Sequence, residues 1–152
     1  MLSKEEKKAN NQLFWDGFNK EMRQIKNRRN VNWLKYPTHI KHVYLRLDCS
    51  KLGAALNFDI QFKDPDIREI FWEQLLELRK VMEKETGISG TWTRNIQAQE
   101  GFVFDRIQWI DPDLDYHDLE SWSKIYAFLK ERLLAFDAFY QEFKDVLILL
   151  VD

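Results

Sequence analysis

Cysteine is almost absent from this chain of 152 residues: Cys49 is the only one, which excludes an internal disulfide and suits a reducing compartment. Glycine is also scarce, with five residues, and none of them builds a glycine-rich phosphate loop. The longest apolar run, 146-VLILLV-151, is far too short to span a bilayer. The charged start MLSKEEKK excludes a signal peptide, so we expect a cytoplasmic protein with no membrane partner.

Acidic residues are missing from residues 22–47, although the chain as a whole carries a net charge of −2. The basic residues of this stretch are Arg23, Lys26, Arg28, Arg29, Lys35, Lys41 and Arg46. Carboxylates gather instead in residues 105–120, which predicts a basic side and an acidic side. Basic residues interleaved with Trp33, Tyr36 and Tyr44 are typical of nucleic-acid surfaces. The alternative is a solvated loop and strand whose charge is balanced elsewhere in the fold.

Apolar residues make up 45% of the chain and charged residues 32%, which indicates a soluble globular protein. The length predicts a single domain over residues 1–152. Aromatic residues reach 14%, with six tryptophans. They predict a core built from large side chains, with an aromatic binding surface as the alternative.

Helical patterns occupy three regions of the chain. The first helix is expected from the capping box at Ser3 to about Lys26, with Phe14, Phe18 and Met22 on its apolar stripe. The second begins at the Asp64-Pro65 cap and runs to Gly87. The third follows Asp118 and is longer than a domain of this size requires. Either this helix bends near Phe136, or its distal half forms a surface for a homodimer.

Two hairpins lie between these helices. Residues 40–48 and 54–63 alternate apolar and polar side chains, and a turn centred on Lys51-Leu52 pairs Leu45 with Phe58 and Leu47 with Leu56. Residues 91–97 and 102–110 form the second hairpin, with Gly101 in its turn. The prediction is therefore an α+β fold of order α-ββ-α-ββ-α, with an antiparallel sheet of four strands and helices on one face. A fifth short strand around Trp33 is the alternative.

The sequence also contains an internal similarity. The stretch 60-IQFKDPDI-67 matches 107-IQWIDPDL-114 at five of eight positions, and each copy joins a second hairpin strand to a helix. This pattern predicts a ββα unit used twice. The alternative is that strand-to-helix corners share an Asp-Pro cap by chance.

Gln61-x-Lys63 at the end of a strand resembles half of the metal-binding motif of restriction-type nucleases. Such a site needs further oxygen ligands, but 38-THIKH-42 at the start of the partner strand carries no carboxylate. Asp48 lies opposite Ala55, so at the strand rise it is roughly 26 Å from Lys63. We therefore predict no catalytic residue, metal or cofactor, and keep an unusual nuclease as an alternative.

The remaining prediction is a non-enzymatic binding module for nucleic acid or a protein partner. Its contact surface combines the basic segment with the polar face of the first hairpin, where aromatic, Arg and amide side chains can stack on and hydrogen-bond a ligand. An ordinary solvated face with an Arg46–Asp59 diagonal pair is the alternative. The predicted contact residues are Arg28, Arg29, Trp33, Lys35, His42, Tyr44, Arg46, Asp59, Gln61 and Lys63.

Several stretches resemble one bacterial family. They are 2-LSKEEKK-8, 12-QLFWDGF-18, 40-IKHVYLRLD-48 and 58-FDIQFKDPDIREIFWEQL-75. Together they are similar to the family known as domain of unknown function forty-two sixty-eight, over roughly residues 2–145. Members of that family occur as small stand-alone chains and fused behind nuclease-like domains. The resemblance implies an association with nucleic-acid metabolism or defence, and it transfers no catalytic residue.

Overall fold

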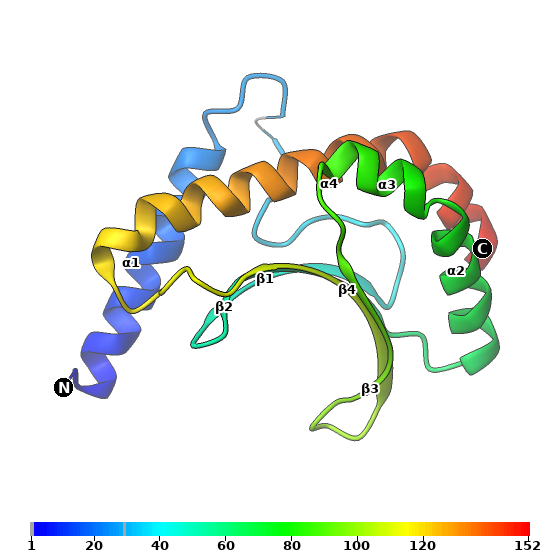
Figure 1. Cartoon of the computed structure of the whole chain (residues 1–152), viewed down its shortest axis with the longest axis horizontal. Coiled ribbons are helices and arrows are strands. Elements are labelled where there is room, and N and C mark those ends of the chain that lie inside the picture. Colours follow the sequence, from blue (N-terminus) through cyan, green and yellow to red (C-terminus); the bar gives the residue numbers. More distant parts are fainter. Residues whose placement is uncertain (1, 29) are drawn as a thin grey trace.

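The computed structural model describes residues 2–28 and 30–152, and it has the predicted α+β fold (Figure 1). The elements are α1 (Lys4–Met22), β1 (Val43–Ser50), β2 (Gly53–Ile60), α2 (Pro65–Glu77), α3 (Arg79–Thr86), β3 (Thr91–Gln97), β4 (Val103–Asp111), a 3-10 turn (Leu119–Ser121) and α4 (Trp122–Val151). No helix in the described residues is long and apolar enough to cross a membrane.

The sheet has four antiparallel strands in the order β1-β2-β4-β3. The register of the first hairpin is the predicted one, with Leu45 opposite Phe58 and Leu47 opposite Leu56. Figure 1 shows the sheet as an arch with the helices on its convex side. In the described part of the chain, no helix covers the concave side. The two central strands, β2 and β4, come from different hairpins.

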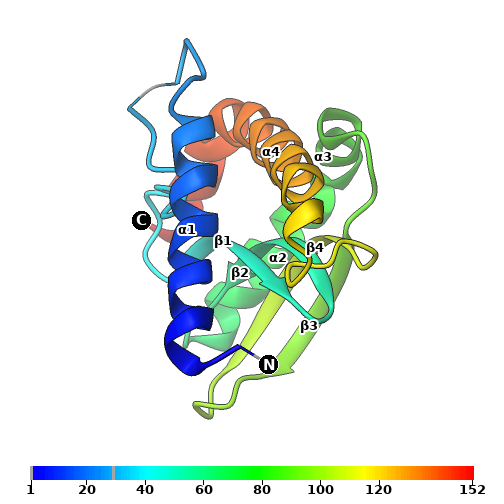
Figure 2. The ribbon, with the colours of Figure 1, turned by 90° about the vertical axis from the view of Figure 1, so that its left-hand side faces the viewer.

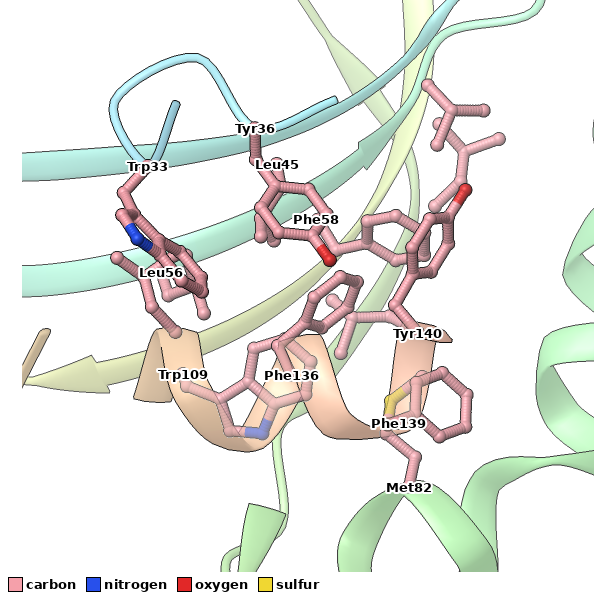
Figure 3. Packing of buried hydrophobic residues seen from close by; sticks show 14 of the residues in the cluster. Trp33, Tyr36, Leu45, Leu56, Phe58, Met82, Trp109, Phe136, Phe139 and Tyr140 are labelled. Atoms are coloured by element: carbon pink, nitrogen blue, oxygen red, sulfur yellow. The ribbon is translucent and has the colours of Figure 1, made fainter. Parts of the chain in front are cut away.

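The core lies between the convex side of the sheet and α4 (Figure 3). The Phe58 ring packs 4.9 Å from the Phe136 ring, and Phe136 stacks on Tyr140 at 5.5 Å between centroids. Trp33 and Trp109 are also fully buried here. The high aromatic content therefore mainly serves packing, since large rings fill the space between an arched sheet and a long helix.

The first helix forms as predicted but is shorter. Ser3 and Glu6 make both hydrogen bonds of the capping box, and Phe14, Phe18 and Met22 are buried. The helix ends at Met22 and not near Lys26, because the next amides, of Gln24 and Ile25, bond three residues back and tighten the chain into turns.

The predicted second helix is two helices. Asp64 caps α2 and Gly87, at φ 75°, ends α3, as expected. The helix breaks at Leu78, whose backbone is at φ −90° and ψ 0°. The break turns α3 so that Met82 is buried beside Phe139 of α4 (Figure 3). Tertiary packing overrides the continuous helical periodicity here.

The last helix is continuous over 30 residues and arches across the sheet (Figure 1). Asp118 caps the short 3-10 turn that leads into it, through the amide of Glu120. Near its start, the Tyr126 hydroxyl donates to the Phe14 carbonyl at 2.6 Å. Figure 2 views this region with α1 in front.

Residues 23–28 and 30–42 form a segment between α1 and β1 that we call the strap. The strap contains no strand, so the alternative of a fifth strand around Trp33 is wrong for the described residues. Its Tyr36 hydroxyl and Arg28 guanidinium both donate to Asp137 of α4. The strap is therefore fastened to the convex side of the molecule.

The positions of the two hairpins are compatible with the predicted repeat, which stays a prediction; only the first Asp-Pro pair leads directly into a helix. Their second strands, which carry the two similar stretches, are the adjacent central strands. The register pairs Asp59 with Arg106, and each of these residues immediately precedes its copy of the repeat. Equivalent positions of the two copies thus face each other, as expected at a local two-fold axis.

Candidate functional site

The concave side of the sheet, which we call the open face, is polar. Consecutive rows cross it from strand to strand: Tyr44 pairs with Asp59, Asp59 with Arg106, and Arg106 with Thr93. The neighbouring row contains Arg46, Asn57, Gln108 and Thr91. Side chains of one strand alternate between the two faces, so the same alternation that builds the core aligns these polar groups.

A buried carboxylate stands at the centre of the open face. Asp59 is 0% exposed because Arg106 donates to both of its oxygens, at 2.6 and 3.0 Å, while Arg46 approaches at 3.4 Å. The hydrogen bond from Arg106 to Asp59 raises the pKa of the guanidinium, against desolvation, which lowers it. The predicted Arg46–Asp59 diagonal pair is therefore present, but the carboxylate is not solvated.

Each of these two arginines also lies over an aromatic ring. The Arg46 guanidinium carbon is 4.2 Å from the Tyr44 ring centroid, and that of Arg106 is 5.1 Å from the Phe104 centroid. Such contacts are cation–π interactions. Asp59 thus orients two guanidinium groups, and each group is stacked on a flat side chain of its own strand.

A hollow of about 1130 Å³ lies over this part of the open face. It is lined by Arg46, Asp48, Gln61, Ile96, Gln97, Ala98, Gln99, Glu100, Phe102, Phe104 and Arg106. The lining carries both signs of charge, because it includes Asp48 and Glu100 as well as the two arginines. It is therefore a mixed polar and aromatic surface and not a purely basic one.

A smaller hollow of about 500 Å³ adjoins the first, and Gln61 and Phe102 line both. Its other lining residues are His42, Phe62, Lys63, Pro65, Arg68 and Val103. No carboxylate belongs to this lining. The backbone N–H of Gln61 donates to the His42 carbonyl at 2.8 Å. This bond joins the end of β2 to the residues that lead into β1.

A second buried carboxylate, Asp105, faces the helices. Arg68 of α2 donates to it at 2.8 Å, the Asn95 backbone amide at 2.9 Å, and Arg94 at 3.4 Å. The contacts hold α2 against the irregular part of β3, where the register shifts between Thr93 and Ile96. We assign this cluster a structural role, because its members bond to one another.

The structure divides the predicted contact residues between two places. Tyr44, Arg46 and Asp59 meet on the open face, and His42, Gln61 and Lys63 meet around the smaller hollow. The strap residues lie elsewhere: Arg28 is paired with Asp137, Trp33 is 1% exposed, and Lys35 is exposed on the strap. Arg29 lies outside the described residues.

The prediction from sequence missed Arg106, Gln108 and Phe102. Gln108 donates to Asn57 at 2.9 Å across the central strand pair. These residues lie on the second hairpin, whose position beside the first is a long-range feature. For Arg106 and Gln108 the internal repeat was the available signal, because it aligns Gln108 with Gln61 and Arg106, immediately before the second copy, with Asp59.

The chemistry of these groups suits non-covalent recognition. Among residues 2–28 and 30–152, no group of three or more His, Cys, Asp or Glu side chains is placed to hold a metal ion. Burial, and secondly the charge of Asp48, raise the pKa of the Cys49 thiol to about 12, so it is a weak nucleophile. The amides, the guanidinium groups over aromatic rings and the two hollows offer hydrogen bonds and stacking surfaces.

Comparison with known proteins places the chain in a family. Searches among curated proteins and among solved structures find no match. The model of a family described as Domain of unknown function (DUF4268) matches residues 11–144, which include the sheet and most of α4. The chain therefore belongs to the DUF4268 family.

Proposed function

We propose that this protein is a non-enzymatic binding module whose ligand is a single strand of nucleic acid lying across the open face. The observation that carries the proposal is the pair of arginine–aromatic stacks fixed by one buried carboxylate. Single-stranded bases expose flat faces that stack on aromatic rings and guanidinium planes. In a duplex those faces are hidden, so we expect a preference for single strands.

The amide groups support the same ligand. Gln61 lies where the two hollows meet, and the partly exposed Gln108 is held in place by its hydrogen bond to the buried Asn57. Carboxamides both donate and accept hydrogen bonds, which suits the polar edges of unpaired bases.

Charge is expected to contribute less than in a strongly basic module. The cations at the two hollows that a strand could reach are Arg46, Arg106 and Lys63, while Asp48 and Glu100 oppose them. With at most three phosphates neutralised, log Kd should change with log salt by a slope of about 2. A much steeper slope would point to the exposed lysines of the strap.

The test is a titration of the protein into three labelled ligands: a single-stranded DNA of 12 nucleotides, an RNA of the same sequence, and the corresponding DNA duplex. Binding is followed by fluorescence anisotropy at low and moderate salt with Mg²⁺. The open-face variant combines Tyr44→Thr with Arg46→Gln. The matched control combines Asn32→Thr with Lys35→Gln on the strap, so that each variant removes one exposed cation. We expect the open-face variant to weaken single-strand binding about tenfold or more, from the loss of stacking, and the control to leave it within twofold.

Two results would contradict the proposal. Equal weakening by both variants would place binding on general surface charge, and no binding at any salt would exclude nucleic acid as the ligand. The same samples on a denaturing gel test the alternative of an unusual nuclease. That alternative requires strand cutting that depends on Mg²⁺ and disappears in Lys63→Ala.

A second candidate function is self-association through the end of α4. Val146, Leu149 and Leu150 are 45%, 73% and 37% exposed, which is unusual for large apolar residues so close together. Sedimentation over a hundredfold range of concentration tests it. A mass that rises with concentration in the unmodified protein and not in Leu149→Lys would support a homodimer.

A further inference from the structure

The smaller hollow has the construction of a pocket for a flat group. Phe62 is buried and held by Phe71, with ring centroids 5.3 Å apart at a steep angle. Phe102 is 36% exposed and packs on Phe104 at 5.9 Å. The pocket is thus lined by one buried and packed aromatic residue and by one accessible aromatic residue. Its volume of about 500 Å³ lies within the usual range for small-molecule sites.

Half of the eight residues that line this pocket are polar or charged, and their side chains differ in freedom to move. The Arg68 guanidinium already donates to Asp105 at 2.8 Å and to Asn95 at 2.9 Å, so it forms a fixed part of the wall. Lys63 is exposed at the rim and supplies a movable positive charge. Gln61 and His42 contribute a carboxamide and an imidazole, which can donate and accept in one plane.

The backbone at His42 is strained. Its φ is 73°, in the left-handed region that residues other than glycine seldom adopt. Such strain persists only where surrounding structure enforces it, and it gathers at ligand sites. Here the His42 carbonyl accepts a hydrogen bond from the backbone N–H of Gln61, and His42 lines the pocket. The strained residue and the two-walled pocket coincide.

We propose that this pocket binds the terminal nucleotide of the strand on the open face, and so gives the module a preference for a strand end and for the base at that end. The base packs on the aromatic walls, Gln61 and His42 contact its polar edge, and Lys63 contacts a phosphate. This inference rests on the proposed function, because it takes the strand to continue from the larger hollow past Gln61 and Phe102.

An apolar peptide side chain is the main competing occupant. It would fill the aromatic walls but leave the carboxamide and imidazole without hydrogen bonds, which is unfavourable in a partly closed pocket. A nucleobase satisfies both kinds of wall. The rim lysine also matches a nucleotide, whose phosphate lies outside the pocket when the base is inside.

The experiment measures two ligand sets by calorimetry and anisotropy. Mononucleoside 5′-phosphates of the four bases probe the pocket alone, and 12-nucleotide strands with each of the four terminal bases probe it in context. The pocket variant is Phe102→Ala, and the comparison variant is Tyr44→Thr on the open face. Loss of one stacked base is expected to weaken binding about tenfold.

If the inference is correct, Phe102→Ala weakens mononucleotide binding about tenfold and removes the difference between terminal bases. Tyr44→Thr then weakens the strands but not the mononucleotides. A different result is that Phe102→Ala changes neither mononucleotide binding nor the difference between terminal bases, while Tyr44→Thr still weakens binding of the strands. The pocket assignment is then wrong and the proposed function stands. If no strand binds but mononucleotides bind through Phe102, the proposed function is wrong and the pocket is a nucleotide site on its own.

A second variant separates binding from folding. His42→Gly removes the imidazole but suits the positive φ, so it should not lower the thermal midpoint. We expect it to reduce the discrimination between bases in a folded protein. Unchanged discrimination, or saturable binding of an apolar dipeptide in place of any nucleotide, would overturn the inference.

Discussion

Asp59 is the residue on which the geometry of the open face depends. It is fully buried, while its partners Arg106 and Arg46 are 28% and 47% exposed, so the pair is only partly screened by water. Replacing Asp59 by Asn keeps the shape but removes the charge that both guanidinium groups share. We expect a loss of about 2 kcal/mol in the free energy of unfolding, measured by urea titration.

The matched control is Asp48→Asn, which removes an exposed carboxylate from the same face. It should change the free energy of unfolding by no more than about 0.5 kcal/mol. Similar small effects of both substitutions would mean that Asp59 does not organise the face.

Cys49 offers a test at high pH. Burial raises the pKa of its thiol from 9.0 to about 12. Because the thiolate is the reactive form, disulfide reagents at pH 8 should react about a thousandfold more slowly with the folded chain than in concentrated urea. The unfolded chain releases the proton first, so this group stabilises the fold fully below pH 9, and its contribution is lost as the pH rises towards 12. Equal reaction rates in the two states would contradict the assignment.

At the scale of elements, two glycines in turns allow the cost of backbone strain to be measured separately from the cost of a steric clash. Gly53 and Gly101 both have positive φ, of 121° and 95°. A Cβ on Gly53 would lie 2.2 Å from the Asp111 carbonyl oxygen, whereas one on Gly101 meets nothing within 4 Å. We expect Gly101→Ala to cost about 1 kcal/mol and Gly53→Ala at least about 3 kcal/mol, by urea titration. Equal costs would show that the β1–β2 turn can move away from β4.

The strap is a further element whose attachment can be tested. Asp137 accepts hydrogen bonds from Arg28, at 2.8 Å to each oxygen, and from Tyr36 and Gln141. Asp137→Asn should weaken this attachment by about 1–2 kcal/mol and speed tryptic cleavage after Arg23 and Lys26. Glu142→Gln, an equal charge change at an exposed site on α4, is the control. Unchanged cleavage in Asp137→Asn would show that the strap is held mainly by its buried rings.

At the scale of the whole molecule, the local parts of the fold could be predicted from the sequence. The alternation of apolar and polar side chains within residues 40–63 is sufficient to predict the β1–β2 register. The position of the turn and the need to keep apolar side chains on one face of the sheet determine that register. The length of the helix after Asp64 could not be predicted in the same way. Its apolar stripe is continuous, and only the packing of Met82 against α4 requires the break at Leu78.

The candidate site was harder to predict, because it depends on contacts between distant parts of the chain. Asp59 was expected on the accessible polar face of the first hairpin, and its burial arises from Arg106, which is 47 positions away. Arg28 belongs to an acid-free stretch, and its partner Asp137 is 109 positions away. Neither contact follows from periodicity. The family model matches residues 11–144 but adds no residue of known role.

The facing of Asp59 and Arg106 also bears on ancestry. In an assembly of two identical hairpins, a residue at the two-fold axis meets its own copy, so a charged residue there would meet the same charge. Opposite charges at such a position require that the two copies differ in sequence. Exchanging them, as Asp59→Arg with Arg106→Asp, should restore part of the stability that either single reversal removes, with a coupling of about 1–3 kcal/mol in urea titrations. Strictly additive losses would argue against near-equivalence of the two positions, whereas coupling would show that each position accepts either charge when its partner carries the opposite one.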